Sequence, residues 1–317
     1  MTGSVRLIEV GRASPDAART ELLAGLTAQP AAIPPKYFYD ALGSRLFAAI
    51  TALPEYYPTR TEAAIFAGHA ADMARHLPLT DTLVDLGAGN CEKAASLFGA
   101  FGVKRYVAVD ISAAYLQHSL EVLRRLHPDI DLVGVGMDFA TRLALPAELG
   151  SGPRLMFYPG SSIGNFTPSE ALAFLRQVQC ACQGGGLLIG VDLVKPVEVL
   201  EAAYDDALGV TAAFNRNVLS HVNAIAGTNF MLDDWRHVAF FEPVASRIEM
   251  HLEAVRDVML HWPAGQRRFA AGERIHTENS YKWRVDDFAG LLQEAGFSAS
   301  RHWIDERGWF AVFLAQA

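Results

Sequence analysis

A glycine-containing loop with charged flanks is the first feature of the sequence that could bind a small molecule. It reads Val84-Asp85-Leu86-Gly87-Ala88-Gly89-Asn90-Cys91-Glu92-Lys93, and it lies where a predicted strand turns into a predicted helix. Ligands of open α/β sheets bind at the carboxyl ends of the strands. Gly87 and Gly89 would let the backbone approach a ligand without a Cβ clash. By themselves these glycines do not identify the ligand.

The charge of this loop discriminates between two classes of nucleotide cofactor. A dinucleotide fingerprint has a third glycine at the helix start, close to the pyrophosphate, and this sequence has Glu92 there. A carboxylate at that position repels a pyrophosphate. S-adenosylmethionine (SAM) carries a sulfonium and no phosphate, so an acidic loop does not repel it. A nicotinamide oxidoreductase is therefore the less favoured class of enzyme.

Further acidic and aromatic residues follow the next two predicted strands. Asp110 ends the second strand, where a carboxylate can accept hydrogen bonds from both ribose hydroxyls. Asp138 and Phe139 close the third strand and would place an acid beside the adenine amino group and a ring against adenine. Lys93 could pair with the methionyl carboxylate. The alternative is that these carboxylates only cap strands and helices, but three acids in register favour a SAM site.

The elements that would position these residues alternate between short apolar runs and helical patterns from residue 81 onward, which is typical of a parallel sheet wrapped by helices. A helix over 112–126 is indicated by leucines on one face. Another begins after Thr167, with Pro168 in its first turn and Glu170 completing a capping box. The predicted strands are 82–86, 105–110, 132–137, 155–158 and 187–193.

After Pro196 this alternation stops and resumes only near the C-terminus. The intervening segment contains helical stretches and a long β-like run over 247–260. A helix near 286–295 and a hairpin of strands 300–304 and 309–314 are predicted to follow. We therefore expect an α/β fold with a Rossmann-like sheet domain and a smaller α+β domain. The sheet domain would comprise 61–196 plus 286–317, and the smaller, substrate-binding domain 1–60 plus 197–285.

Composition limits the possible partners. The net charge of −8 argues against binding to nucleic acid, because such proteins neutralise phosphates with clustered basic residues. Three cysteines do not form a disulfide or zinc pattern, and the ten histidines show no metal-binding spacing. No apolar stretch has the length of a membrane span or the form of a leader. We expect a cytoplasmic monomer that acts on a small molecule, without a metal and without a membrane partner.

Several longer strings resemble one family, the histidine Nα-methyltransferases of ergothioneine biosynthesis, and the resemblance covers nearly the whole chain from about residue 20. The strings are Lys36-Tyr37-Phe38-Tyr39-Asp40-Ala41-Leu42-Gly43-Ser44, Leu53-Pro54-Glu55-Tyr56-Tyr57-Pro58-Thr59-Arg60-Thr61-Glu62, Gly160-Ser161-Ser162-Ile163-Gly164-Asn165-Phe166-Thr167-Pro168, Tyr204-Asp205-Asp206, Gly209-Val210-Thr211-Ala212-Ala213-Phe214-Asn215-Arg216-Asn217, Arg247-Ile248-Glu249-Met250 and Thr277-Glu278-Asn279-Ser280. The match departs slightly at Ala88-Gly89-Asn90-Cys91 and at Asn279.

The resemblance implies a function and a role for each matching residue. It implies three successive methylations of L-histidine by SAM to Nα,Nα,Nα-trimethyl-L-histidine (hercynine), with the smaller domain closing over histidine. The residues that would contact SAM are Tyr39, Gly87, Lys93, Asp110, Asp138 and Phe139. Those that would hold the amino-acid backbone are Tyr56, Gly160, Asn165 and Tyr204, while Glu278 and Ser280 would bond the imidazole and Met250 would line its pocket.

Methyl transfer is an in-line displacement, so an enzyme's main tasks are to align the nitrogen lone pair and to exclude water. Tyr56 and Asn165 are the candidate catalytic residues: Tyr56 to orient the amine, and Asn165, with Tyr204, to donate neutral hydrogen bonds to the carboxylate. The α-amine must be neutral to attack, and burial beside a sulfonium disfavours its protonated form. A dedicated base is therefore not required.

Each of these residues also has a purely structural interpretation. Tyr56 could belong to a packed turn, Asn165 could adopt a left-handed turn conformation, Glu278 could be a solvated strand residue and Met250 could fill a core. Two alternatives for the whole chain also stay open at this point. One is an N-methyltransferase of another amino acid or biogenic amine, and the other is a non-catalytic protein that keeps the cofactor fold.

Overall fold

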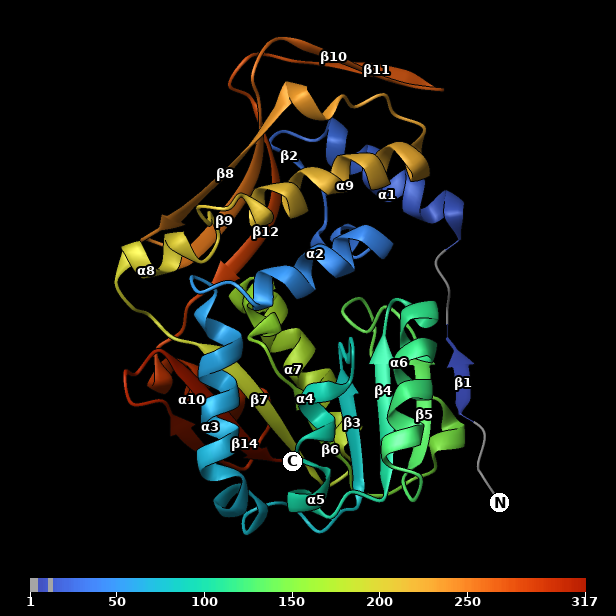
Figure 1. The fold of residues 1–317 in the computed structure, drawn as a ribbon, viewed down its shortest axis with the longest axis vertical. Helices are drawn as coiled ribbons and strands as arrows, with labels where there is room; N and C mark the ends of the chain where they lie inside the picture. The colour runs from blue at the N-terminus through green and yellow to red at the C-terminus, as the bar shows by residue number, and fades with distance from the viewer. Residues whose placement is uncertain (1–4, 11–13) are drawn as a thin grey trace. The chain divides into compact units, whose positions relative to one another are not determined.

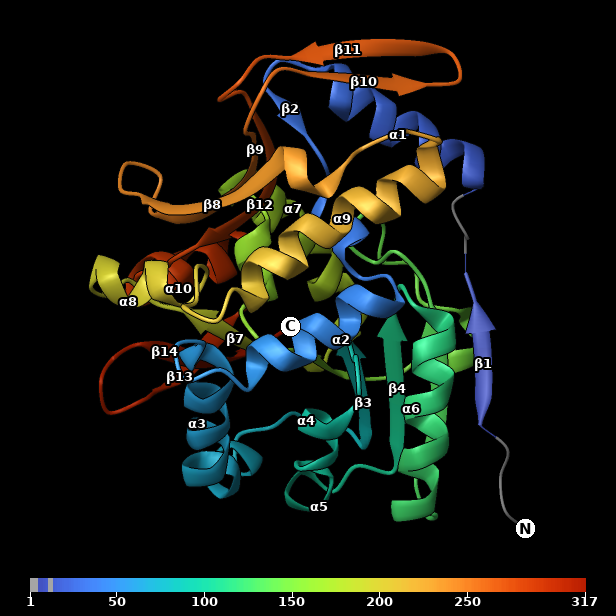
Figure 2. The same ribbon diagram turned by 45° about the horizontal axis from the view of Figure 1, so that its top comes forward.

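The computed structural model describes residues 5–10 and 14–317. Its contacts divide the chain into two compact units (Figures 1 and 2). The first, which we name the large-sheet unit, consists of the described part of Met1–Arg12 with Pro58–Val194 and Lys282–Ala317. The second, the small-sheet unit, consists of the described part of Ala13–Tyr57 with Lys195–Tyr281. Residues 5–10 thus group with the large sheet, whereas the sequence analysis predicted them in the smaller domain.

The large-sheet unit is built on eight strands in the order β1-β5-β4-β3-β6-β7-β14-β13. The strands from β1 to β7 pair in parallel, and β14 is antiparallel to both β7 and β13. Their bounds are β1 Arg6–Glu9, β3 Thr82–Leu86, β4 Arg105–Asp110, β5 Asp131–Gly136, β6 Leu155–Tyr158, β7 Gly186–Asp192, β13 Ala299–Ile304 and β14 Phe310–Gln316. The central strands are almost fully buried, as strands covered on both faces must be.

The helices of this unit connect its strands or precede them in the chain. They are α3 Tyr57–Ala74, α4 Glu92–Ala95, α5 Phe98–Phe101, α6 Ala113–Leu126, α7 Pro168–Cys182 and α10 Val285–Glu294, with the short η2 Ala147–Leu149 and η3 Ser162–Asn165. The predicted capping box of α7 is confirmed: Glu170 N–H bonds the Thr167 hydroxyl, and the Glu170 carboxylate accepts from Thr167 N–H. These two bonds satisfy donors that the first helical turn would leave unpaired.

The sequence located most strands of this unit. β3, β4 and β6 have the predicted bounds, β5 and β7 differ by one residue at each end, and the C-terminal hairpin is confirmed as β13 and β14. β1 was not predicted. It is a four-residue edge strand that pairs with β5, so it lacks the longer apolar run that identified the buried strands.

The small-sheet unit has a four-stranded sheet in the order β2-β12-β9-β8 and a separate hairpin of β10 and β11. Its strands are β2 Ala31–Ala32, β8 Trp235–Glu242, β9 Arg247–Ala254, β10 Val258–Trp262, β11 Gly265–Phe269 and β12 Arg274–Tyr281. Its helices are α1 Pro15–Thr27, η1 Pro35–Phe38, α2 Ala41–Thr51, α8 Val197–Ala202, α9 Val210–Ala226 and η4 Leu232–Asp234. The prediction of one continuous β run over 247–260 was wrong, because residues 255–257 separate β9 from β10, which pairs with β11 instead.

A β-bulge in β12 decides which side chains share a face of the small sheet. The pairing with β9 shifts between His276 and Glu278, so that Thr277 is the extra residue. Without it, strict alternation would turn Glu278 to the face of His276. With it, Glu278 lies opposite Met250, and the Thr277 hydroxyl donates to the Met250 carbonyl at 3.0 Å.

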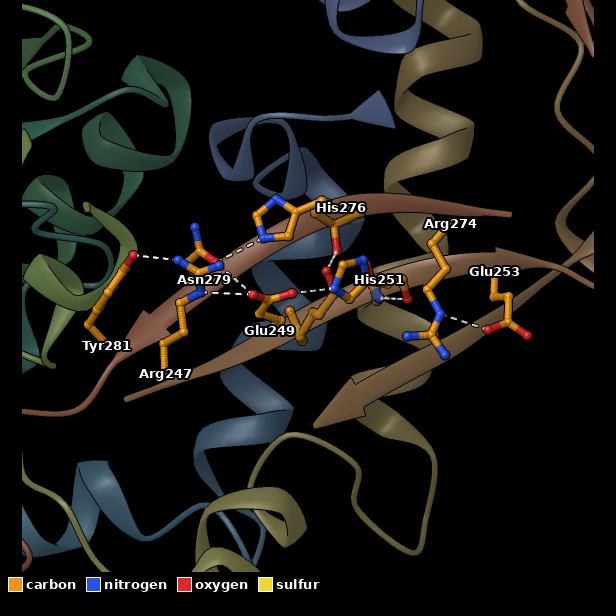
Figure 3. Close-up of polar contacts among 11 residues, drawn as sticks. Arg247, Glu249, His251, Glu253, Arg274, His276, Asn279 and Tyr281 are labelled. Carbon is orange, nitrogen blue, oxygen red and sulfur yellow. Dashed lines mark hydrogen bonds and ion pairs between the residues drawn. The ribbon is translucent and has the colours of Figure 1, made fainter. Parts of the chain in front are cut away.

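The opposite face of this sheet carries a network of charged residues (Figure 3). The Glu249 carboxylate accepts from Arg247 Nε at 2.9 Å and lies 2.8 Å from His251 Nε2. Asn279, directly across from Glu249, contacts His276 Nε2 at 2.9 Å. The other side of the same strands carries Met250, Glu278 and Ser280.

Within the described ranges, none of the helices combines the length and the apolar character needed to cross a membrane.

Candidate functional site

The glycine loop after β3 leaves open backbone at the carboxyl end of the sheet. Gly87 and Gly89 have φ of 77° and 53°, which favours glycine at both positions. The N–H groups of Gly87 and Ala88 donate to the Val109 carbonyl of β4 at 2.8 and 3.1 Å. A Cβ on Gly87 would lie 3.7 Å from the ring of Phe139. The structure therefore brings the loop, the end of β4 and Phe139 together, as the sequence predicted.

Asp110 is hydrogen-bonded to this loop, and its carboxylate can still accept further hydrogen bonds. Its Oδ2 accepts from Gly89 N–H at 3.0 Å, and its Oδ1 accepts from Ser112 N–H at 2.9 Å. Burial raises the pKa of Asp110, and the backbone donors oppose that rise. Each carboxylate oxygen has a second lone pair, so both can still accept from ribose hydroxyls. These two acceptor oxygens fit the ribose hydroxyls of SAM.

Asp138 and Phe139 follow β5 and differ in their surroundings. The Asp138 carboxylate accepts from the Thr141 hydroxyl at 2.9 Å. The Phe139 ring meets Tyr158 edge-on at 6.0 Å between centroids. An aromatic wall beside an exposed glycine suits a flat apolar ring such as adenine.

Asp85 is a buried acid to which the sequence analysis gave no role. Its Oδ2 accepts from the Tyr106 hydroxyl at 2.7 Å, whereas Oδ1 has no hydrogen-bond partner within the described chain. Burial raises the pKa of Asp85 to about 7. Its place two residues before Gly87 was visible in the sequence, but its burial was not.

Lys93 and Gly160 are joined through a residue that the sequence analysis did not single out. The ammonium of Lys93 forms a short ion pair with Glu62 Oε2, and the other oxygen of Glu62 accepts from Gly160 N–H at 2.8 Å. Glu62 comes from α3 and is completely buried. The only sequence signal was its position at the end of one family-like string.

The loop after β6 carries Gly160 and Asn165. Gly160 and Ser161 have φ of 77° and 57°, and η3 follows directly. Asn165 ends η3 half-buried, and the interpretation of Asn165 as a left-handed turn residue was wrong, because the left-handed residues of this loop are the other two. The Ser161 hydroxyl accepts from Asp192 N–H of β7 at 2.8 Å, which fixes the loop to the sheet.

In the small-sheet unit, Met250, Glu278 and Ser280 lie on one face of neighbouring strands. Their exposed fractions are 2%, 9% and 4%. The interpretation of Glu278 as a solvated residue was therefore wrong. The Ser280 hydroxyl lies 2.7 Å from the Tyr204 hydroxyl, which joins the residue expected at the imidazole to one expected at the carboxylate. The carbonyl of Tyr204 is in turn 2.9 Å from His237 Nε2.

An aromatic cluster connects the remaining predicted residues of this unit. Tyr56 meets Tyr204 edge-on at 6.3 Å and Phe47 at 6.2 Å. Phe47 meets Tyr39 at 5.7 Å, and Tyr39 meets Phe214 at 5.9 Å. Tyr39, Tyr56 and Tyr204 thus belong to one group of packed aromatic rings. This packing restrains the rings that carry their hydroxyl groups.

The predicted site residues accordingly form two groups. The large-sheet unit holds Gly87, Lys93, Asp110, Asp138, Phe139, Gly160 and Asn165, and the small-sheet unit holds Tyr39, Tyr56, Tyr204, Met250, Glu278 and Ser280. In residues 5–10 and 14–317, no group of three or more histidine, cysteine or acidic side chains is arranged to hold a metal ion.

A parallel sheet with a glycine loop after β3 and acids following β4 and β5 defines a Rossmann-like class I SAM-dependent methyltransferase. Comparison with known families narrows this class. The model of the SAM-dependent histidine-specific methyltransferases matches residues 18–317, and the chain belongs to that family.

Characterised relatives agree with this assignment. The chain is 42% identical to the histidine N-alpha-methyltransferase of Mycolicibacterium smegmatis over 95% of both proteins. It is 39% identical to the protein of the same name from Mycobacterium tuberculosis over 94% of both. Ergothioneine biosynthesis protein 1 of Schizosaccharomyces pombe is 30% identical over 84% of this chain, which spans 36% of that longer relative.

Proposed function

We propose that this protein transfers three methyl groups from SAM to the α-amino nitrogen of L-histidine, giving hercynine, the first step of ergothioneine biosynthesis. Family membership supports the reaction type. The observation that carries the choice of substrate is the nearly enclosed carboxylate of Glu278, which shares a sheet face with Met250 and Ser280. A buried carboxylate of this kind favours a ligand that brings its own N–H donor.

The large-sheet unit supplies the groups that hold SAM, which provides a methyl bound to a sulfonium. The loop at Gly87 lets SAM approach the protein backbone, and Asp110 accepts hydrogen bonds from the ribose hydroxyls. Asp138 binds the adenine amino group, and Phe139 packs against the adenine ring. Lys93 keeps donors beyond its pair with Glu62, because an ammonium has three. One of them is available for the methionyl carboxylate.

The small-sheet unit supplies the groups that select the imidazole. Glu278 accepts one ring N–H, and Ser280 exchanges a hydrogen bond with the other ring nitrogen while keeping or giving up its contact with Tyr204. An amino acid without ring nitrogens would not offer Glu278 this hydrogen bond in a desolvated site. Such mismatches reduce turnover much more than a missing methylene does.

In this proposal, uncharged residues bind the amine and the carboxylate of the substrate. Tyr56 orients the amine, and Asn165, Gly160 and Tyr204 bind the carboxylate. Neutral donors add no positive charge beside the sulfonium, and the burial that excludes water also favours the neutral, attacking form of the amine. No covalent intermediate with the protein is needed.

A substrate panel tests this proposal. Purified protein is incubated with SAM and each of the common amino acids and several biogenic amines, with EDTA present because we expect no metal requirement. We expect mass gains of one, two and three methyl groups on histidine alone. Gains on another amine instead of histidine would contradict the substrate, and no gain on any compound with intact binding of S-adenosylhomocysteine (SAH) would identify a non-catalytic protein. Size-exclusion chromatography with light scattering tests the expected monomer, and cell fractionation the expected cytoplasmic location.

A further inference from the structure

We propose that Glu62 is a positioning residue that fixes Lys93 and the Gly160 loop with one carboxylate. This role rests on the proposed function only for the identity of the two ligands. Lys93 lies in α4, directly after the glycine loop that follows β3, and Gly160 lies in the loop after β6. Glu62 is on neither segment, and its location on α3 lets it reach both of them from the body of the large-sheet unit.

The contacts of Glu62 divide cleanly between its two oxygens. Oε2 forms the ion pair with the Lys93 ammonium, and Oε1 accepts from Gly160 N–H at 2.8 Å. The carboxylate is fully enclosed, whereas the Lys93 side chain is 31% exposed. Burying a lone carboxylate is costly, so the two partners stabilise each other and neither is free to turn away.

The Glu62 carboxylate occupies the space that a side chain on Gly190 would need. A Cβ on Gly190 of β7 would overlap Glu62 Oε1. The φ of Gly190 is not positive, so this strand position needs glycine for space and not for its backbone conformation. An acid that occupies a hollow over the strand backbone is held more rigidly than one on a surface.

Rigidity at this point has a binding consequence. A lysine side chain that becomes ordered only when its ligand arrives loses rotamer freedom, and this loss weakens binding. Glu62 orders the Lys93 stem beforehand and leaves ammonium protons for a ligand carboxylate. The bond to Gly160 restrains the second loop in the same way, because glycine can otherwise adopt many backbone conformations.

The two oxygens predict separable effects of substitution. Glu62→Gln keeps an acceptor for Gly160 N–H but places a neutral amide against Lys93. Glu62→Ala removes both contacts. We therefore expect Glu62→Gln to weaken SAH binding about tenfold with little change in the KM for histidine, and Glu62→Ala to impair both.

Calorimetric titration with SAH tests the inference without depending on turnover. The matched control is Asp72→Asn, which removes a carboxylate near the other end of α3, where it bonds Trp303 and Arg75, and which should leave the SAH Kd unchanged. Lys93→Met is made alone and together with Glu62→Gln. If Glu62 acts through Lys93, the double variant binds SAH as Lys93→Met does; additive losses would overturn the role.

A second variant tests the same contact in case Glu62→Gln does not fold. Gly190→Ala keeps both charges and displaces the carboxylate, so we expect it to weaken SAH binding as well. Wild-type SAH affinity in both Glu62→Gln and Gly190→Ala would contradict the inference, whatever the substrate. Conversely, a protein that binds SAH through Glu62 and Lys93 but leaves histidine unmethylated would contradict only the proposed function.

Discussion

At the scale of single residues, two acids on opposite faces of the small sheet have different surroundings. Glu278 has 9% exposure and lies opposite Met250, while Glu249 on the other face has Arg247 and His251 as partners. Glu249 is held by polar side chains of its own strand, whereas Glu278 is the enclosed acid that we propose accepts a hydrogen bond from the ligand.

Glu278→Ala should therefore abolish histidine turnover and preserve the cofactor site. We expect kcat/KM for histidine to fall at least about 100-fold, which corresponds to roughly 3 kcal/mol, since a hydrogen bond to a charged group is lost in a desolvated site. The SAH Kd measured by calorimetry should stay within about twofold. Loss of SAH binding would show that Glu278 serves the large-sheet unit instead.

The matched control is Glu249→Gln, which neutralises a carboxylate on the adjacent strand and the opposite face (Figure 3). We expect it to lower the melting temperature and to change the KM for histidine less than about threefold. Equal losses of histidine turnover in the two variants would indicate a general effect on the sheet.

The sequence could supply candidate residues at this scale but not their enclosure. Family-like strings pointed to Glu278, Ser280 and Tyr204, and the structure adds the 2.7 Å contact between the last two. For Glu62 and Asp85, the sequence showed the residue type but gave no sign of a role. Their importance comes from complete burial and from contacts with segments distant in the chain, which no local pattern encodes.

At the scale of elements, the bulge of β12 places the residues that we propose face the substrate. Thr277 is fully buried, and its hydroxyl holds the Met250 carbonyl across the strand pair. Alternation read from the sequence would have put Glu278 and Ser280 on the face of His276. A bulge cannot be derived from period-two patterns, because it is a break in that pattern.

Thr277→Val should loosen this bulge, because it keeps the shape of the side chain and removes the hydroxyl. We expect a loss of about 1 kcal/mol in the free energy of unfolding and a several-fold rise in the KM for histidine. Thr277→Ser keeps the hydroxyl and serves as the control. Denaturant unfolding and steady-state kinetics measure both effects, and equal behaviour of Val and Ser would rule out the hydrogen bond as the cause.

Other elements were predictable where burial extends over a whole strand. β3, β4 and β6 have the predicted bounds because continuous apolar runs bounded by polar residues identify strands buried on both faces. The short edge strand β1 and the interruption between β9 and β10 depend on pairing partners, and the sequence does not specify partners locally.

At the scale of the whole molecule, burial shifts the pKa of titratable groups in opposite directions in the two units. Burial lowers the pKa of His237, His251 and His276 in the small-sheet unit from 6.5. Burial raises the pKa of Asp85 to about 7 and also raises that of Asp110 in the large-sheet unit. The sequence showed which residues titrate, and only the folded chain shows the sign of each shift.

These shifts predict opposite pH dependences of stability. A histidine with a lowered pKa stabilises the fold above 6.5, and this contribution is lost as pH falls, because the unfolded state then binds more protons. An aspartate with a raised pKa stabilises the fold at low pH, and this contribution is lost as pH rises through about 7. Between pH 7 and 5.5 the small sheet should lose stability while the strands around Asp85 gain it.

Hydrogen exchange followed by mass spectrometry, corrected for intrinsic rates, resolves the two units. We expect peptides from β8, β9 and β12 to lose protection on acidification and peptides from β3 and β4 to gain it. A change of the same sign in both sets would show that other groups dominate the pH dependence.

The central claim is methylation of the α-nitrogen of histidine, and the most direct measurement locates the transferred methyl groups. The protein is incubated with histidine and SAM labelled with ¹³C in its methyl group, and the product is examined by NMR. We predict a single signal from three equivalent methyls that correlates with the α-carbon proton, as in hercynine. A methyl signal that correlates with the imidazole protons, or no labelled histidine at all, would contradict the account.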